Sequence, residues 1–264
     1  MTLILPQRGR IRQAAAGGFT DPSSLTNSFW IDGGDTSALW TGAGSGTPTA
    51  DDRIYRIDNK GSDTRYAYLE QPTEANRAYY RSGGFLDFAT TYNYLLGEKY
   101  DAGLTNGPWS IVLLINMDDV SNTYLFKEYN SDPDFVCLIF AKNTGTGTGE
   151  IARRVKSYAD DVNNVTRMND TTTGGGWTAG TLQVITLIYP GGANHLVAYK
   201  ETSQVSGEIS HSMELGTWGT TTDFQLNYQA AFDLHHAVIV DYDIRDAGTE
   251  FDDLVTWLKT EGGL

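Results

Sequence analysis

The chain has 264 residues and a net charge of −14, with 19 basic and 33 acidic side chains. This charge excludes nucleic acid as the partner of the body of the chain, because an acidic surface repels phosphates. The single cysteine, Cys137, excludes a framework of intrachain disulfides. No stretch approaches the roughly 20 apolar residues of a membrane span, so we expect no membrane insertion.

Residues 1–19 differ from the rest of the chain because they carry basic side chains and no acidic one. An apolar cluster is followed by alternating arginines, and the residues concerned are Leu3, Ile4, Leu5, Pro6, Arg8, Arg10 and Arg12. Alternate residues of an extended chain point the same way, so this segment suggests an attachment arm laid on the acidic surface of a partner. The alternative is a frayed terminus. We expect no secretory signal, because such a peptide needs about 7–15 apolar residues after its charges.

From residue 54 on, short stretches rich in β-branched and aromatic residues alternate with turn residues, and this spacing predicts strands. The predicted strands are 54–57, 67–69, 78–80, 85–88, 110–117, 123–127, 135–141, 151–158, 182–189, 195–200, 224–228 and 235–242. No helical stretch separates them, so residues 20–264 are predicted to form one antiparallel β-sandwich.

One segment, residues 246–261, has a strong helical period. Its apolar stripe consists of Phe251, Leu254, Val255 and Leu258. This spacing predicts a C-terminal helix that Asp246 caps and the following two glycines end.

The order of several segments resembles that of a known family. Residues 53–61 read RIYRIDNKG and residues 78–88 read AYYRSGGFLDF. Together with 109–114, 177–199, 235–245 and the final helix, they resemble the successive motifs of concanavalin A-like, laminin-G-type jelly rolls. Two positions depart from the family's pattern, since Arg56 stands where a tryptophan is usual and residues 233–236 replace a glycine-rich turn.

This resemblance implies an all-β jelly-roll sandwich with a C-terminal helix and, outside it, an extended N-terminal arm. Such domains occur in phage and bacterial surface proteins, and the first residues resemble the start of several tailed-phage structural proteins. We therefore expect a non-enzymatic virion component, either a capsid decoration, a head fibre or a tail-associated protein, assembled in the host cytoplasm. Its expected partners are other virion proteins, with many copies or a homo-oligomer on the particle. The alternatives are a free lectin-like carbohydrate-binding module and a polysaccharide-degrading enzyme.

No catalytic residue is predicted. Asp241 and Asp243 put two carboxylates on one strand face, but their place at the end of the last strand favours a structural role. His235 and His236 are adjacent, so on a regular strand they face opposite sides and cannot chelate one ion. No cofactor is predicted either, although the acidic loops 118–119, 132–134 and 160–164 have the oxygen ligands that Ca²⁺ uses. Solvated turns are the favoured interpretation of these loops.

Tyrosines are dense between residues 66 and 94. The set consists of Tyr66, Tyr68, Tyr79, Tyr80, Tyr92 and Tyr94. Exposed aromatic rings stack on sugars and dominate protein interfaces, so this set predicts a surface for glycan binding or assembly. The alternative is that most of these rings line the core.

Overall fold

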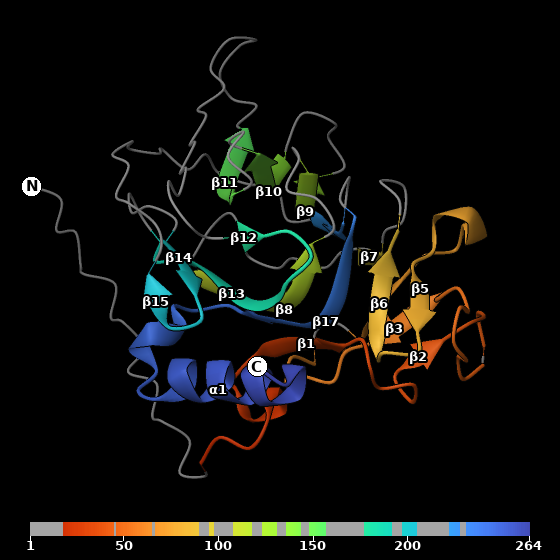
Figure 1. The fold of residues 1–264 in the computed structure, drawn as a ribbon, viewed down its shortest axis with the longest axis horizontal. Helices are drawn as coiled ribbons and strands as arrows, with labels where there is room; N and C mark the ends of the chain where they lie inside the picture. Colours follow the sequence, from red (N-terminus) through yellow and green to blue (C-terminus); the bar gives the residue numbers. More distant parts are fainter. Residues whose placement is uncertain are drawn as a thin grey trace, which may run out of the picture.

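The structure is a computed structural model. It describes residues 18–44, 46–64, 67–89, 95–97, 108–117, 123–130, 136–143, 148–156, 177–191, 197–204, 222–227 and 231–264. Two antiparallel sheets form a β-sandwich, and a C-terminal helix lies on the outer side of one of them (Figure 1). The predicted fold class is confirmed.

The first sheet contains most of the long buried strands. Its order is β15 (Ser203–Gln204), β14 (Val197–Lys200), β13 (Leu182–Tyr189), β8 (Trp109–Met117), β17 (Phe232–Val240), β6 (Phe85–Phe88) and β5 (Tyr79–Arg81). In addition, β1 (Ser28–Asp32) pairs with the second half of β17, from His236–Asp32 to Val240–Ser28, next to the stretch that pairs with β6.

The second sheet ends in a set of very short strands. Its order is β12 (Trp177–Thr178), β11 (Thr148–Lys156), β10 (Val136–Asn143), β9 (Thr123–Asn130), β16 (Thr222–Leu226), β7 (Leu95–Gly97), β4 (Tyr68–Glu70), β3 (Arg56–Asp58) and β2 (Leu39–Trp40).

Four helical segments complete the described part of the chain: η1 (Pro22–Ser24), η2 (Glu74–Asn76), η3 (Ile244–Asp246) and α1 (Glu250–Gly262). The predicted helix is therefore present, but its predicted start is wrong. Asp246 lies in η3, and Thr249 holds the N-cap position of α1, where its hydroxyl donates to Asp253 at 2.6 Å. At the other end, Gly263 adopts φ 65° and stops the helix, as the left-handed conformation of a glycine commonly does.

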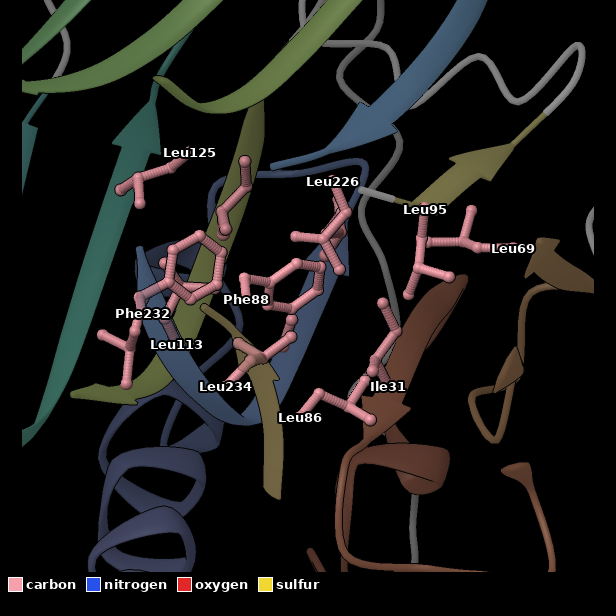
Figure 2. Close-up of a cluster of buried hydrophobic side chains, with 14 of the residues drawn as sticks. Ile31, Leu69, Leu86, Phe88, Leu95, Leu113, Leu125, Leu226, Phe232 and Leu234 are labelled. Atoms are coloured by element: carbon pink, nitrogen blue, oxygen red, sulfur yellow. The ribbon is translucent and has the colours of Figure 1, made fainter. Parts of the chain in front are cut away.

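Two hydrophobic cores lie on opposite faces of the first sheet. Figure 2 shows the core between the two sheets, where the rings of Phe88 and Phe232 lie 4.8 Å apart. The other core lies under α1, whose Leu254 and Leu258 pack with Val112 and Leu114 of β8. Burial on both faces explains why residues 111–115 of β8 form an uninterrupted apolar run instead of an alternating one.

Strand β17 carries a β-bulge at His235, because the register against β8 shifts between Leu234 and His236. Leu234 and Ala237 both lie in the core between the sheets, although they are three residues apart. His235 stacks on Phe85 and His236 contacts Trp30, so both histidines point away from that core. The expectation that they face opposite sides is wrong, because the extra residue of a bulge breaks the alternation.

Within the described residues, no helix is long and apolar enough to cross a membrane.

Candidate functional site

Strands β2, β3 and β4 have one face in the core and one facing outward. Leu39, Ile57 and Leu69 lie in register across the three strands and are buried in the core between the sheets. Successive side chains of a strand alternate between faces, so the neighbours of these three residues point outward. We call the outward set the β2–β4 face, and it consists of Trp40, Arg56, Asp58, Tyr68 and Glu70.

Arg56 occupies the centre of the β2–β4 face between two aromatic rings. Its guanidinium carbon lies 3.9 Å from the ring centroid of Tyr68 and 4.9 Å from that of Trp40. Tyr68 is 39% exposed and is the most exposed aromatic side chain in the described part of the chain. Each such cation–π contact contributes about 0.5–1 kcal/mol at an exposed site, so Arg56 holds both rings in place.

Asp58 fixes both Arg56 and Trp40. One carboxylate oxygen accepts from Arg56 Nε at 2.6 Å, and the other accepts from Trp40 Nε1 at 2.9 Å. Among the described residues, the two terminal nitrogens of Arg56 bind no acceptor. The guanidinium is therefore held at its Nε edge, and its outer N–H groups are available to a ligand.

A third ring, that of Tyr55, lies beside the β2–β4 face, where it contacts Glu70. Loss of hydration, together with the hydrogen bond to the Glu70 carboxylate, raises the pKa of Tyr55 above its usual value. Glu70 stands directly opposite Arg56 in the register of β3 and β4. The β2–β4 face thus presents planar rings with donors and acceptors between them.

Arg77 packs against the ring of Tyr55 beside the β2–β4 face. Its guanidinium carbon lies 5.0 Å from the ring centroid of Tyr55. Its three nitrogens donate to the backbone carbonyls of Gln71 at 2.9 Å, Pro72 at 3.0 Å and Thr41 at 3.4 Å. These hydrogen bonds attach the Arg77 side chain to the loop after β4 and to Thr41, which follows β2.

The structure divides the predicted tyrosine set. Tyr68 lies on the β2–β4 face of the second sheet, whereas Tyr79 and Tyr80 lie in β5 of the first sheet. Tyr80 packs against the core between the sheets. Tyr66, Tyr92 and Tyr94 lie outside the described residues, so their part in a surface stays a prediction.

Tyr79 has a charged environment of its own. Its ring lies between Arg53 and Arg81, whose guanidinium carbons are 4.9 and 4.8 Å from the centroid. Arg81 is bound by two carboxylates, those of Asp51 and Asp87. This arrangement ties the edge strand β5 to its neighbours and leaves Tyr79 enclosed by long side chains.

His236 lies under the C-terminal helix. Its ring is 5.1 Å from that of Trp257 in α1, and its Nδ1 accepts from Trp30 Nε1 at 3.4 Å. Burial lowers the pKa of His236 to about 4, and the nearby Asp32 carboxylate, at 3.7 Å, opposes this shift only in part. His236 is therefore a neutral acceptor at neutral pH.

The carboxylate of Asp32, which lies beside His236, shares one ammonium group with the carboxylate of Asp35. Lys60 Nζ lies 2.7 Å from Asp32 and 2.6 Å from Asp35. The hydrogen bonds from Lys60 and Ser37 lower the pKa of Asp35 to about 2. A general acid needs a raised pKa at neutral pH, so Asp35 is not suited to that role.

The carboxylates at the end of β17 have structural partners. Asp243 caps η3 and pairs with Arg245 at 2.5 Å, and Asp241 accepts from Asn27. In the described part of the chain, no group of three or more histidine, cysteine or acidic residues could hold a metal ion. The acidic loops considered for Ca²⁺ lie outside the described residues.

The predicted arm also lies outside the described residues, since the seven residues from Leu3 to Arg12 fall within 1–17. Its docking role stays a prediction. Conversely, sequence reasoning missed Trp40, Asp58 and Glu70 and singled out Arg56 only as a departure from a motif. The one signal for them was local alternation, Leu39 before Trp40 and Ile57 between Arg56 and Asp58.

No protein-family model matches the chain. No curated protein matches it either. Among solved structures, the chain is similar to a Trypanosoma rangeli sialidase in complex with a difluorinated nononic acid, with a TM-score of 0.50 and 10% identity over 86% of this chain and 33% of the sialidase. The chain thus spans about a third of the length of that sialidase.

Two further solved structures match this chain over nearly all of their own length. One is domain 4 of the extracellular arabinanase AbnA from Geobacillus stearothermophilus, in complex with arabinotriose, with a TM-score of 0.43 and 16% identity over 86% of this chain and 97% of that domain. The other is an alginate lyase Aly36B variant in complex with an alginate tetrasaccharide, with a TM-score of 0.47 and 10% identity over 85% of this chain and 99% of the lyase.

These findings correct the function expected from the sequence. The chain was expected to be a virion structural protein without enzymatic activity, but the structure that shares its fold is that of a sialidase. The jelly-roll resemblance holds for the fold, whereas the resemblance to phage proteins has no support. The expectation of no enzymatic activity is overturned by the likeness to the sialidase.

Proposed function

We propose that the chain is a carbohydrate-binding β-sandwich and that the β2–β4 face is its binding surface. The observation that carries this proposal is Tyr68, an exposed ring held against Arg56 beside Trp40 on the outer face of the sheet. The C–H face of a pyranose or furanose ring stacks on such aromatic surfaces. The sialidase that shares the fold is a carbohydrate-active protein, which supports a glycan-related function.

The polar groups of this face suit sugar hydroxyls. The terminal nitrogens of Arg56 donate, and the carboxylates of Asp58 and Glu70 accept, within a few ångströms of the rings. A hydroxyl is both a donor and an acceptor, so it pairs with either kind of group.

The face is also held in shape before a ligand arrives. Asp58 binds Arg56 and Trp40 at once, and Arg56 in turn contacts Tyr68. A surface that is already ordered loses less conformational entropy on binding. Affinity then depends on the number of sugar units that reach the rings.

Native gel electrophoresis in the presence of soluble polysaccharides tests the proposal. The mobility of the protein should fall in gels that contain a bound polymer, and Tyr68→Ala should weaken this retardation about tenfold or more. Tyr79→Ala is the matched control, because it removes the same ring from the first sheet and should leave binding unchanged. Melting curves of both variants check that each one is folded.

The same experiment separates the alternatives. If Tyr79→Ala abolishes the retardation and Tyr68→Ala leaves it unchanged, the binding site lies at β5 instead. Release of reducing ends or of unsaturated products from any of the polysaccharides would identify a polysaccharide-degrading enzyme.

A further inference from the structure

We infer that the β2–β4 face selects uncharged sugars and rejects sugars that carry a carboxylate or a sulfate. This inference rests on the proposed function and adds the class of ligand. It follows from the contacts of two cations, Arg56 on the face and Arg77 beside it, which already bind acceptors of the protein.

An anionic sugar is normally recognised by a guanidinium that is free to form two parallel hydrogen bonds. The described residues at this face contain two guanidinium groups. Arg77 donates from all three of its nitrogens to backbone carbonyls. Three of its five N–H donors are thus used to hold backbone carbonyls, and these bonds orient the guanidinium toward the loop after β4.

Arg56 is the remaining cation, and its charge is already matched. Asp58 binds its Nε at 2.6 Å. Glu70 adds a second carboxylate directly across the pair of strands from Arg56. A ligand carboxylate at the terminal nitrogens of Arg56 would therefore approach the carboxylates of Asp58 and Glu70, and like charges repel each other.

The rest of the molecule adds to this preference. The chain has a net charge of −14, so it repels a polyanion as it approaches. This long-range part is screened beyond about 8 Å at physiological ionic strength. The local carboxylates of the face remain effective at higher salt, whereas the repulsion by the whole body does not.

For a neutral sugar the same groups are favourable. Its hydroxyls can donate to Glu70 and Asp58 and accept from Arg56, while the ring stacks on Tyr68. None of these contacts requires a buried charge to lose its partner, which is the costly event in polar recognition.

Gel retardation against two pairs of polymers tests the inference: arabinan and galactomannan as neutral ligands, and alginate and polysialic acid as anionic ligands. At 50 mM and at 500 mM NaCl, the neutral polymers should be bound at least about tenfold more tightly than the anionic ones. Glu70→Gln should narrow this gap severalfold at both salt concentrations. Asp252→Asn removes the same charge from an exposed position of α1 and should leave the gap unchanged.

The outcomes separate this inference from the proposed function. Equal or tighter binding of alginate or polysialic acid, weakened by salt, would overturn the selectivity and leave carbohydrate binding intact. If Glu70→Gln changes the ratio of affinities for neutral and anionic polymers no more than Asp252→Asn does, the assignment of selectivity to this face is overturned. Retardation by none of the four polymers would overturn the proposed function itself.

Discussion

Acid should destabilise this protein through His236 as the pH falls from about 6.5 to about 4. The side chain is buried against Trp30 and Trp257, and burial lowers its pKa from 6.5 to about 4. In the unfolded chain the imidazole binds a proton at its ordinary pKa of about 6.5. Between these two values the unfolded state binds a proton that the folded state excludes, so stability falls as the pH falls.

The structure gives the size of this effect. A pKa difference of about 2.5 between the two states, at 1.36 kcal/mol for each unit, corresponds to about 3 kcal/mol lost from pH 7 to pH 4. The carboxylate of Asp35 acts in a separate range, because its pKa in the folded state is about 2. Its stabilising contribution is present above its ordinary value of 3.8 and is lost only as the pH falls below that value towards 2.

Urea unfolding followed by tryptophan fluorescence measures this loss. The free energy of unfolding should be determined at pH 7 and pH 4.5 for the wild type and for His236→Gln, which can still accept a hydrogen bond from Trp30. The wild type should lose about 2–3 kcal/mol more than the variant over this range. His235→Gln serves as a comparison with a smaller effect in the same direction, because burial also lowers the pKa of His235.

Identical pH dependence in the wild type and in His236→Gln would refute this reasoning. It would mean that the imidazole is hydrated in the folded protein, so that Trp257 of α1 does not cover it. The position of the helix on the first sheet would then have to change as well.

Two further substitutions test the packing of the first sheet. Leu254→Ala should lower the free energy of unfolding by about 2–5 kcal/mol, because Leu254 is fully buried under α1, and an unchanged urea midpoint would show that the helix packs elsewhere. Gly33→Ala should lower the melting temperature, because its Cβ would meet the carbonyl oxygen of Leu234 at 2.5 Å beside the bulge. For Gly33→Ala, a melting temperature equal to that of the wild type would contradict the close approach of β17 and the turn after β1.

The C-terminal helix shows what a period can and cannot predict. Its apolar stripe gave the helix correctly because all four stripe residues are buried on one side. Its start was wrong because Gly248, at φ 73°, turns the chain between η3 and the helix. A capping residue followed by a helical pattern does not reveal that an intervening glycine breaks the helix into two parts.

Strand β1 was not predicted from the sequence, and the reason is physical. Phe29 and Ile31 enter the core between the sheets, but Trp30 between them is also buried, in the core under α1. Burial on both faces removes the alternation by which a half-exposed strand is recognised. A run of three apolar residues then looks the same as part of a loop.

The β2–β4 face was hidden from the sequence in a different way. Trp40, Arg56 and Tyr68 come from three strands, and they meet only because Trp40 pairs with Arg56 and Asp58 pairs with Tyr68. A shift of one residue in either pairing would turn these side chains into the core and bring Leu39 or Leu69 outward. Tyr68 of the tyrosine-rich stretch is exposed, but the prediction grouped it with Tyr79, which lies in the other sheet because the chain crosses over through η2. Composition can therefore indicate that aromatic rings are concentrated in one stretch, whereas the register of the short strands decides which side chains share a face.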